Sequence, residues 1–315
     1  MKTNSFKPGQ IWLDTSGNPI QAHGGGILYH AGTYYWFGEN KLGNTRPGVL
    51  QDLHRVDVIG INCYSSQDLY NWSYEGIVLP ADPADSASDL HPSKVVERPK
   101  VIYNSRTQKF IMWLHIDTPD YAYARAGVAI SDSPTGPYHY QASIRPNNAM
   151  SRDMTLFQDD EGCAYHISAS EENRTMRIAL LSDDYLKPTE QVVRVFENRF
   201  REAPAIIKHH GKYHLITSGC TGWDANAAEY AIANSIFGSW DIVGNPCRGE
   251  GFEKTFGAQG TFILPVVGKP GKYIFMADIW NKHNLGDSRY AWLQIRYNDE
   301  HIVIEWHDEW DLEML

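Results

Sequence analysis

The chain has 315 residues, of which 42% are hydrophobic, and its mean hydropathy is −0.43. Its formal net charge of −10 argues against a nucleic-acid partner, because surfaces that bind nucleic acid are basic. No apolar run approaches the roughly 18 residues that a membrane-spanning helix needs, so we expect no membrane partner either.

The N-terminus reads M-K-T-N-S-F-K-P-G-Q and lacks the apolar core of a signal peptide. The cysteines show no C-x-x-C spacing, and most of them fall on predicted strands, where a cysteine is usually a small buried hydrophobe. They are Cys63, Cys163, Cys220 and Cys247. We therefore expect free thiols and a cytoplasmic location, although a secreted protein with its signal trimmed off would have the same sequence.

Five pairs of apolar strands follow one another along the chain, each pair joined by a turn. They are expected at 27–30 with 33–38, 100–103 with 109–115, 155–158 with 163–168, 205–209 with 212–218, and 261–267 with 272–280. After each of the first four pairs a strand ends in serine, and a turn leads to an aromatic residue that should pack into the sheet. These aromatic residues are Trp72, Tyr138, Tyr185 and Trp240. A last strand is expected at 302–306.

A polar residue stands just before each strand pair: His23, Glu97, Asp153, Glu202 and Gln259. The steps between the last four are 56, 49 and 57 residues, which is the spacing of four-stranded propeller blades. The sequence thus predicts an all-β fold, a five-bladed β-propeller, with residues 1–315 as a single catalytic domain. Because the innermost strands of all blades start near one cavity, these five side chains should meet there.

Two turn-rich segments, 40–58 and 81–94, interrupt this rhythm. Loops of this length within a compact domain are usually functional. We expect both on the rim of the central cavity, where they could close one end.

Three of the five polar residues are carboxylic acids, and three carboxylates in one cavity are typical of a glycosidase. An inverting glycosidase uses an acid and a base that lie roughly 6.5–9.5 Å apart. Glu202 is the leading candidate for the acid, because Pro204 stiffens the start of its strand and apolar surroundings would raise its pKa. The alternative is an ion pair between Glu202 and Arg201 at a strand end.

Six motifs occur in order along nearly the whole chain, from Gln21 to about Pro265. They read I-Q-A-H-G-G-G-I-L, Y-Y-W-F-G-E-N-K, V-V-E-R-P-K-V-I-Y-N, S-R-D-M-T-L-F-Q-D-D-E-G, E-A-P-A-I-I-K-H-H-G-K-Y and T-G-W. Together they resemble glycoside hydrolase family 43, the five-bladed propeller enzymes, and more closely its branch of exo-β-1,3-galactanases. The resemblance implies an inverting, exo-acting hydrolase that releases galactose from β-1,3-linked galactan or galacto-oligosaccharides.

The resemblance also implies a role for each motif residue. Glu202, in E-A-P, would be the general acid, and Asp153, in S-R-D, would orient that acid and tune its pKa. Glu97, in V-E-R-P-K, would contact the non-reducing galactose. The other residues expected to bind substrate are Arg98, Glu39, Tyr121 and, as a stacking wall, Trp223.

The catalytic base is the point at which this chain departs from the wider family. Most members carry an aspartate on the first blade, where this chain reads N-P-I-Q-A-H. The galactanase branch shares that absence and has a glutamine in the fifth blade, which matches Gln259. Gln259 could position the water or act through its imidic tautomer, and alternatively Glu97 supplies the base. His23 could touch the sugar or hold a water, or be a hydrogen-bonded histidine in a glycine-rich turn.

No cluster of histidines and carboxylates shows the spacing of a zinc site. We assign no metal ligand and require no cofactor, while a structural calcium ion, found in the channel of some relatives, stays open. The expected partner is an oligosaccharide or polysaccharide substrate. One alternative is an α-L-arabinofuranosidase or β-D-galactofuranosidase, with the substrate set by the loops 40–58 and 81–94. Another is a non-catalytic sugar-binding propeller, favoured by Gln259 but opposed by the three retained carboxylates.

Overall fold

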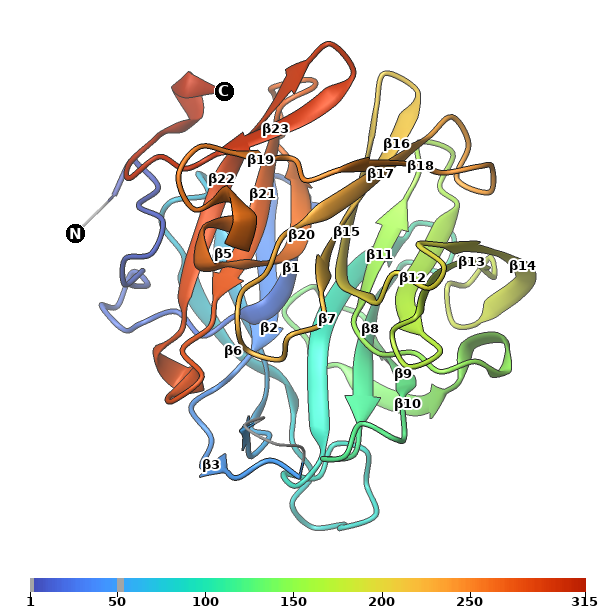
Figure 1. The fold of residues 1–315 in the computed structure, drawn as a ribbon. Coiled ribbons are helices and arrows are strands. Elements are labelled where there is room, and N and C mark those ends of the chain that lie inside the picture. Colours follow the sequence, from blue (N-terminus) through green and yellow to red (C-terminus); the bar gives the residue numbers. More distant parts are fainter. Residues whose placement is uncertain (1–2, 50–53) are drawn as a thin grey trace.

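Five antiparallel sheets surround a common axis in the computed structural model, which describes residues 3–49 and 54–315 (Figure 1). The strands of the first two sheets are β1 (His23–His30), β2 (Thr33–Glu39), β5 (Gly60–Ser66), β6 (Ser73–Pro80), β7 (Val95–Asn104), β8 (Lys109–Asp117), β9 (Arg125–Ser131) and β10 (His139–Ile144). Those of the third and fourth are β11 (Met154–Gln158), β12 (Ala164–Ser170), β13 (Thr175–Leu181), β14 (Pro188–Val195), β15 (Arg201–His209), β16 (Lys212–Gly219), β17 (Glu229–Ala233) and β18 (Asp241–Gly244).

The fifth sheet gains an additional strand that runs parallel to its outer edge. Its strands are β20 (Gln259–Pro265), β21 (Tyr273–Ile279), β22 (Arg289–Asn298) and β23 (His301–Glu305), with β19 (Cys247–Arg248) beside β23. The other described elements are the short pair β3 (Thr45–Arg46) and β4 (Arg55–Val56) and the 3₁₀ helices η1 (Pro146–Asn148), η2 (Phe252–Gly257), η3 (Leu285–Asp287) and η4 (Leu312–Met314).

The first strand of each sheet lies toward the middle of the molecule, and the last strand lies toward its edge (Figure 1). The five inner strands β1, β7, β11, β15 and β20 contact one another in that order, and β20 contacts β1 again. They therefore form a closed ring, and the predicted five-bladed β-propeller is confirmed.

Four of the inner strands include the polar residue that precedes their apolar run. His23 pairs with Glu39, Glu97 with His115, and Glu202 with Ser218 in their antiparallel registers. Gln259 similarly opposes a residue of β21, Asp278. The polar side chains thus belong to the sheets themselves, so their positions are fixed by backbone pairing.

A β-bulge follows the polar residue in all four of these strands, where the register shifts within the next three residues. In β1, β7 and β15 the residue after the polar one has a left-handed backbone: φ is 59° at Gly24, 55° at Arg98 and 52° at Ala203. A bulge bends its strand and redirects the side chains beside it. The repeated bulge is therefore the local device that sets the direction of the polar side chains, and those of Glu97, Glu202 and Gln259 line the pocket described below.

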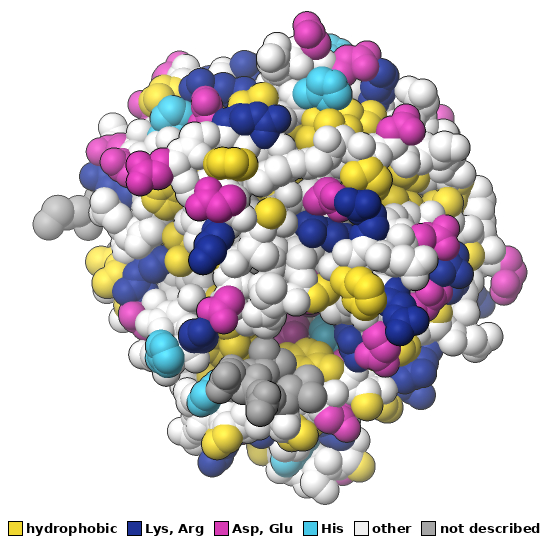
Figure 2. Space-filling view, in the orientation of Figure 1, with side chains coloured by type: hydrophobic (Ala, Val, Ile, Leu, Met, Phe, Trp, Pro, Cys, Tyr) yellow, Lys and Arg dark blue, Asp and Glu magenta, His cyan; other side chains and the backbone are white. Residues whose placement is uncertain are grey.

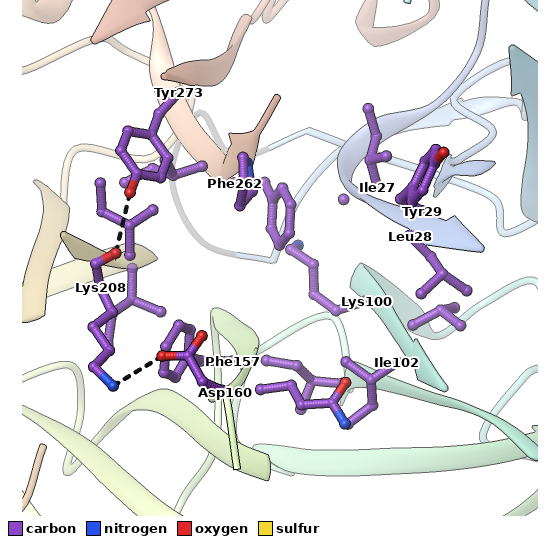
Figure 3. Close-up of a pocket in the computed structure, with 18 residues that line it drawn as sticks. Ile27, Leu28, Tyr29, Lys100, Ile102, Phe157, Asp160, Lys208, Phe262 and Tyr273 are labelled. Carbon is purple, nitrogen blue, oxygen red and sulfur yellow. Dashed lines mark hydrogen bonds and ion pairs between the residues drawn. The ribbon is translucent and has the colours of Figure 1, made fainter. Parts of the chain in front are cut away.

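The central channel is divided along its length. A cavity of about 330 Å³ is lined by the later residues of all five inner strands, as Figure 3 shows. In this view Lys100 extends toward Phe262. A side chain at Gly26 would meet both of them, since an added Cβ would lie 2.6 Å from Lys100 Cδ and 3.2 Å from Phe262 Cδ2. None of these three residues lines the pocket at the end where the inner strands begin, and the two cavities share no lining residue.

Aromatic residues dominate the core between the first and fifth blades. Phe6 and Trp310 exchange two backbone hydrogen bonds, of 2.7 and 3.1 Å, and join the two ends of the chain. Both pack with Trp36, Trp72 and Trp292 in one buried cluster. In Figure 1 the termini accordingly lie on the same side of the molecule.

The aromatic residues predicted to pack into the blades do so. Trp72, Tyr138 and Tyr185 are buried, and Trp240 is partly buried against the core of the third and fourth blades. All four cysteines are free, as predicted.

The two long segments differ in what they contact. Segment 40–58 contains the β3–β4 pair, and its residues 50–53 lie outside the described part of the chain. Segment 81–94 packs on segment 40–58, because Val58 N–H donates to the carbonyl of Pro92 at 2.9 Å. Among the described residues neither segment lines the pocket described below, but segment 40–58 contacts residues of its wall: Lys41 lies 3.6 Å from Glu97, and the carbonyl of His54 accepts from Trp223 Nε1 at 2.7 Å. No helix in the described residues has the length and apolarity to cross a membrane.

Candidate active site

A pocket of about 380 Å³ lies at the end of the channel where the inner strands begin. Seven of the nine residues predicted for the site line it: Glu97, Arg98, Tyr121, Asp153, Glu202, Trp223 and Gln259. The remaining lining residues are His115, Asp120, Arg152, Glu172, Asn173, Cys220 and Gly222. Residues that lie up to 162 positions apart in the sequence, from Glu97 to Gln259, thus line one cavity.

Glu202 is held by two amide groups. Gln259 Nε2 donates to its Oε1 at 2.9 Å, and Asn173 Nδ2 donates to its Oε2 at 3.2 Å. Burial, and then the negative charge of Asp153, raise the pKa of Glu202 to about 8. The carboxyl group is therefore protonated at neutral pH, as a general acid requires.

Arg201 does not pair with Glu202. Its guanidinium donates instead to the hydroxyl and carbonyl of Thr217 and to the carbonyl of Ala227. The structure therefore does not support the alternative in which Glu202 is half of a surface ion pair.

Asp153 lies behind this acid and is fixed by two groups. Arg98 Nη2 forms an ion pair with its Oδ2 at 2.8 Å, and the backbone N–H of Ala203 donates to the same oxygen at 3.1 Å. Ala203 directly follows Glu202, so the left-handed bulge in β15 ties the charge of Asp153 to the position of the acid.

Gln259 uses its whole hydrogen-bonding capacity. Its Oε1 accepts from Arg98 Nη2 at 2.6 Å and from Trp280 Nε1 at 2.9 Å. Its Nε2 donates to Glu202 and, at 3.0 Å, to Ser218 Oγ. In this arrangement Gln259 has no free lone pair, so it can take a proton only after Arg98 or Trp280 turns away.

Glu97 has different surroundings, because no short hydrogen bond occupies its oxygens. Tyr121 Oη lies 3.4 Å away, His115 Nδ1 3.5 Å and Lys41 Nζ 3.6 Å. Burial opposes its ionisation, but the positive charges of Lys41 and His115 outweigh that effect and lower the pKa of Glu97 to about 2. Glu97 is therefore an ionised carboxylate that faces the pocket.

The two remaining predicted residues do not line the pocket. Glu39 is 4% exposed and accepts from Lys41 and from the backbone N–H of Arg98 at 2.9 Å, so it supports the pocket wall from behind. His23 is fully buried: its Nδ1 lies 3.0 Å from Asp278 Oδ1 and its ring stacks on Tyr290. The structure thus places His23 as a hydrogen-bonded histidine in a glycine-rich bulge, away from the sugar.

Several site residues were not identified from the sequence. His115 and Trp280 end the predicted strands 109–115 and 272–280, and that position was the available signal for them. Lys41 closes the motif W-F-G-E-N-K. Asn173 had no such signal, because it is brought to Glu202 by three consecutive left-handed residues, 171–173, between β12 and β13.

Glu97, His115 and Asp153 offer oxygen and nitrogen atoms within 4.8 Å of one another, a separation at which they could hold a metal ion. The surrounding charges oppose one. Arg98 already pairs with Asp153, and Lys41 lies beside Glu97. Burial disfavours the charged form of His115, but Asp117 and Glu97 raise its pKa to about 9, so it too is positive. These residues do not fit the structural calcium ion considered above.

Comparison with known proteins adds two findings. Residues 16–247 match the sequence model described as glycosyl hydrolases family 43. No curated protein sequence matches the chain significantly.

Solved structures resemble this chain over nearly its whole length. A family 43 β-1,3-galactosidase, solved with galactodeoxynojirimycin, is 43% identical with a TM-score of 0.88, and the alignment covers 98% of this chain and 100% of that one. An exo-β-1,3-galactanase from Phanerochaete chrysosporium, solved with galactose, is 36% identical with a TM-score of 0.88, covering 98% of this chain and 68% of that one. For an exo-β-1,3-galactanase from Clostridium thermocellum these values are 36%, 0.84, 97% and 66%. This chain spans about two thirds of the length of the two galactanases.

Proposed function

The chain belongs to family 43 of the glycosyl hydrolases, and on that basis we propose that it is an exo-acting, inverting hydrolase that releases galactose from β-1,3-linked galactans and galacto-oligosaccharides. The observation that carries the proposal is the meeting of Glu97, Asp153 and Glu202 in one pocket, with Glu202 in its protonated form. The substrate follows from the similar galactosidase and galactanases.

In the proposed reaction Glu202 donates its proton to the glycosidic oxygen as the bond from that oxygen to C1 breaks. A water molecule attacks C1 from the opposite face of the sugar, and its proton leaves to the base. Asp153 keeps Glu202 protonated until the leaving oxygen takes the proton. Glu97, an ionised carboxylate with no short hydrogen bond, is the group that can hold this water and accept its proton, whereas Gln259 can contribute only after Arg98 or Trp280 turns away. The chemistry uses protein groups and water alone.

The shape of the pocket supports attack at a chain end. The pocket shares no lining residue with the cavity at the other end of the channel, as expected for a site that does not continue through the propeller. Pockets of a few hundred Å³ enclose small ligands. A terminal sugar can enter such a pocket, while the rest of the chain extends into solvent.

The outer surface is consistent with a neutral substrate. Figure 2 shows acidic and basic side chains interspersed over one face of the molecule. Among the described residues on that face, no continuous basic stripe of the kind that binds a phosphate backbone is visible.

The substrate is tested by incubating the protein with β-1,3-galactobiose, an α-L-arabinofuranoside and a β-D-galactofuranoside, with products separated by chromatography. We expect galactose from the galactobiose, and NMR spectra taken before mutarotation should show the α-anomer first. If the protein cleaves only one of the two furanosides, that furanoside is its substrate and the proposed galactanase activity is wrong. A β-anomer as first product would require a nucleophilic carboxylate within about 5.5 Å of the acid and would overturn inversion.

The non-catalytic alternative predicts a different outcome. A sugar-binding propeller would bind galactobiose and leave it intact. Isothermal titration with galactobiose, followed by chromatography of the same sample, separates binding from turnover.

A further inference from the structure

Trp280 lies beside the pocket directly after β21 and makes a contact that the proposed mechanism does not use. Its indole Nε1 donates to Gln259 Oε1 at 2.9 Å. The indole nitrogen is a donor only, and so is the Arg98 guanidinium that donates to the same oxygen at 2.6 Å. Two obligate donors thus converge on one end of the Gln259 amide.

An amide side chain has nearly the same shape when it is turned by 180°, so its direction is decided by its partners. If Gln259 were turned, its NH₂ group would face the N–H groups of Arg98 and Trp280. Its oxygen would then face Glu202 Oε1, which now receives a hydrogen bond from Nε2 at 2.9 Å. Because Arg98 and Trp280 both donate to the oxygen of the Gln259 amide, the NH₂ group of that amide must point toward Glu202.

Arg98 divides the two N–H groups of its Nη2 between Gln259 and Asp153, the latter at 2.8 Å, so it is not dedicated to the amide. Trp280 has no other hydrogen-bond acceptor among the described residues. Its ring packs edge-on against Trp223 at 5.0 Å between centroids, and the Lys41 ammonium lies over both rings, at 5.3 Å from Trp223 and 5.8 Å from Trp280. The indole is therefore itself held in place.

We propose that Trp280 is a positioning residue, which fixes the direction of the Gln259 amide so that this amide donates its hydrogen bond to Glu202. The inference rests on the proposed function, because it assigns how the acid of that reaction is oriented. It also links the acid to the pocket rim, since Trp223 Nε1 donates to the carbonyl of His54 in segment 40–58 at 2.7 Å.

The test is Trp280→Phe, which keeps an aromatic ring against Trp223 and removes only the N–H donor. We expect kcat on β-1,3-galactobiose to fall about tenfold with KM changed less than about twofold, because the loss affects the orientation of the acid. In a Gln259→Ala background the same substitution should cause no further loss. Trp306→Phe is the matched control, since its indole donates to Asp308 at 2.8 Å outside the pocket and its removal should leave kcat unchanged.

A second measurement does not depend on turnover. The hydrogen bond from Gln259 lowers the pKa of Glu202, so its loss in Trp280→Phe should raise that pKa. NMR titration of carboxyl-¹³C-labelled glutamates follows this change directly, with Glu202→Gln identifying the resonance. A higher pKa in protein that does not cleave galactobiose would support the positioning role and contradict only the proposed function.

Two results would overturn the positioning role. One is an unchanged pKa of Glu202 together with wild-type kcat in Trp280→Phe. The other is an equal loss of kcat in the wild-type and Gln259→Ala backgrounds, because that is expected if Trp280 merely supports the fold.

Discussion

At the scale of single residues, Glu202 shows how surroundings assign a chemical role. Its partners are the neutral amides of Gln259 and Asn173, and a negative charge, that of Asp153, lies nearby. Glu97 lies in the same pocket among positive groups, and its pKa is lowered to about 2 where that of Glu202 is raised to about 8. Two glutamates in one cavity are thus held in opposite protonation states.

Glu202→Gln should lower kcat on β-1,3-galactobiose by about a hundredfold or more, because the leaving oxygen then receives no proton. Aryl galactosides whose leaving groups need no protonation should lose less. Steady-state kinetics with both substrates measures this difference. Glu300→Gln, at an exposed turn outside the pocket, is the control. Near-normal turnover of galactobiose by Glu202→Gln would remove Glu202 as the acid.

Asp153→Asn should change the pH dependence of the reaction as well as its rate. Burial, the larger cause of the raised Glu202 pKa, is unchanged in this variant, but the second cause, the negative charge of Asp153, is lost. The Arg98 guanidinium then has no carboxylate partner at this position, and its positive charge lowers the pKa of Glu202 further. The acid works only while protonated, so a lower pKa means that it loses its proton at a lower pH. The alkaline limb of the kcat–pH profile should therefore move to lower pH. If that limb stays in place, Asp153 contacts the sugar without tuning the acid.

At the scale of elements, the β-bulges at the starts of β1, β7 and β15 are the feature that connects fold to site. A left-handed residue costs a non-glycine side chain about 1–2 kcal/mol, and Arg98 and Ala203 both adopt that conformation. Each of them holds a partner at the site: Arg98 pairs with Asp153 through its side chain, and Ala203 binds the same carboxylate through its N–H. The strain is therefore located where it fixes the acid and its neighbour.

Substituting glycine at the bulge and two residues later should have different effects on stability. Ala203→Gly relieves the left-handed conformation, a gain of about 1–2 kcal/mol that offsets the lost buried methyl group and the added freedom of the unfolded chain, so the free energy of unfolding should change by less than about 1 kcal/mol. Ala205→Gly, in the regular buried part of β15, should lower it by about 1 kcal/mol or more, because it adds backbone freedom to the unfolded chain and removes a packed methyl group. Urea denaturation of both variants measures the difference. Equal losses of stability in the two variants would contradict strain at Ala203.

At the scale of the whole molecule, the ring must close between its first and last blades. No strand is exchanged between these two sheets among the described residues, since each is built from its own stretch of chain. The closure instead uses the N-terminal Phe6 and the C-terminal Trp310, packed into the aromatic cluster that both blades share.

Trp310→Ala should therefore lower the free energy of unfolding by about 3–5 kcal/mol, the cost of a large cavity in a core. Trp306→Ala, at a partly exposed tryptophan of the same segment, should cost less. Chemical denaturation followed by circular dichroism compares them. Equal effects of the two substitutions would show that the aromatic cluster does not stabilise the contact between the first and last blades.

The five blades can be predicted from the amino-acid sequence, because the period of the strand pairs and the polar residue before each pair are local patterns. Most of the pocket lining can be predicted as well, since seven of nine named residues line one cavity. In a propeller the inner strands of all blades begin around one axis. Residues at equivalent positions of each blade are therefore expected to converge there, and no further information is needed to predict it.

The partners of these residues, in contrast, depend on the folded chain. Whether His23 faces the sugar or Asp278 depends on the packing of the first blade against the fifth, across more than two hundred residues of sequence. The same holds for Gln259, which is flanked by Arg98 from the second blade and Glu202 from the fourth. Hydrogen bonds and pKa values at the site arise from side chains that come within a few ångströms only when the ring closes, and no local pattern in the sequence records that distance.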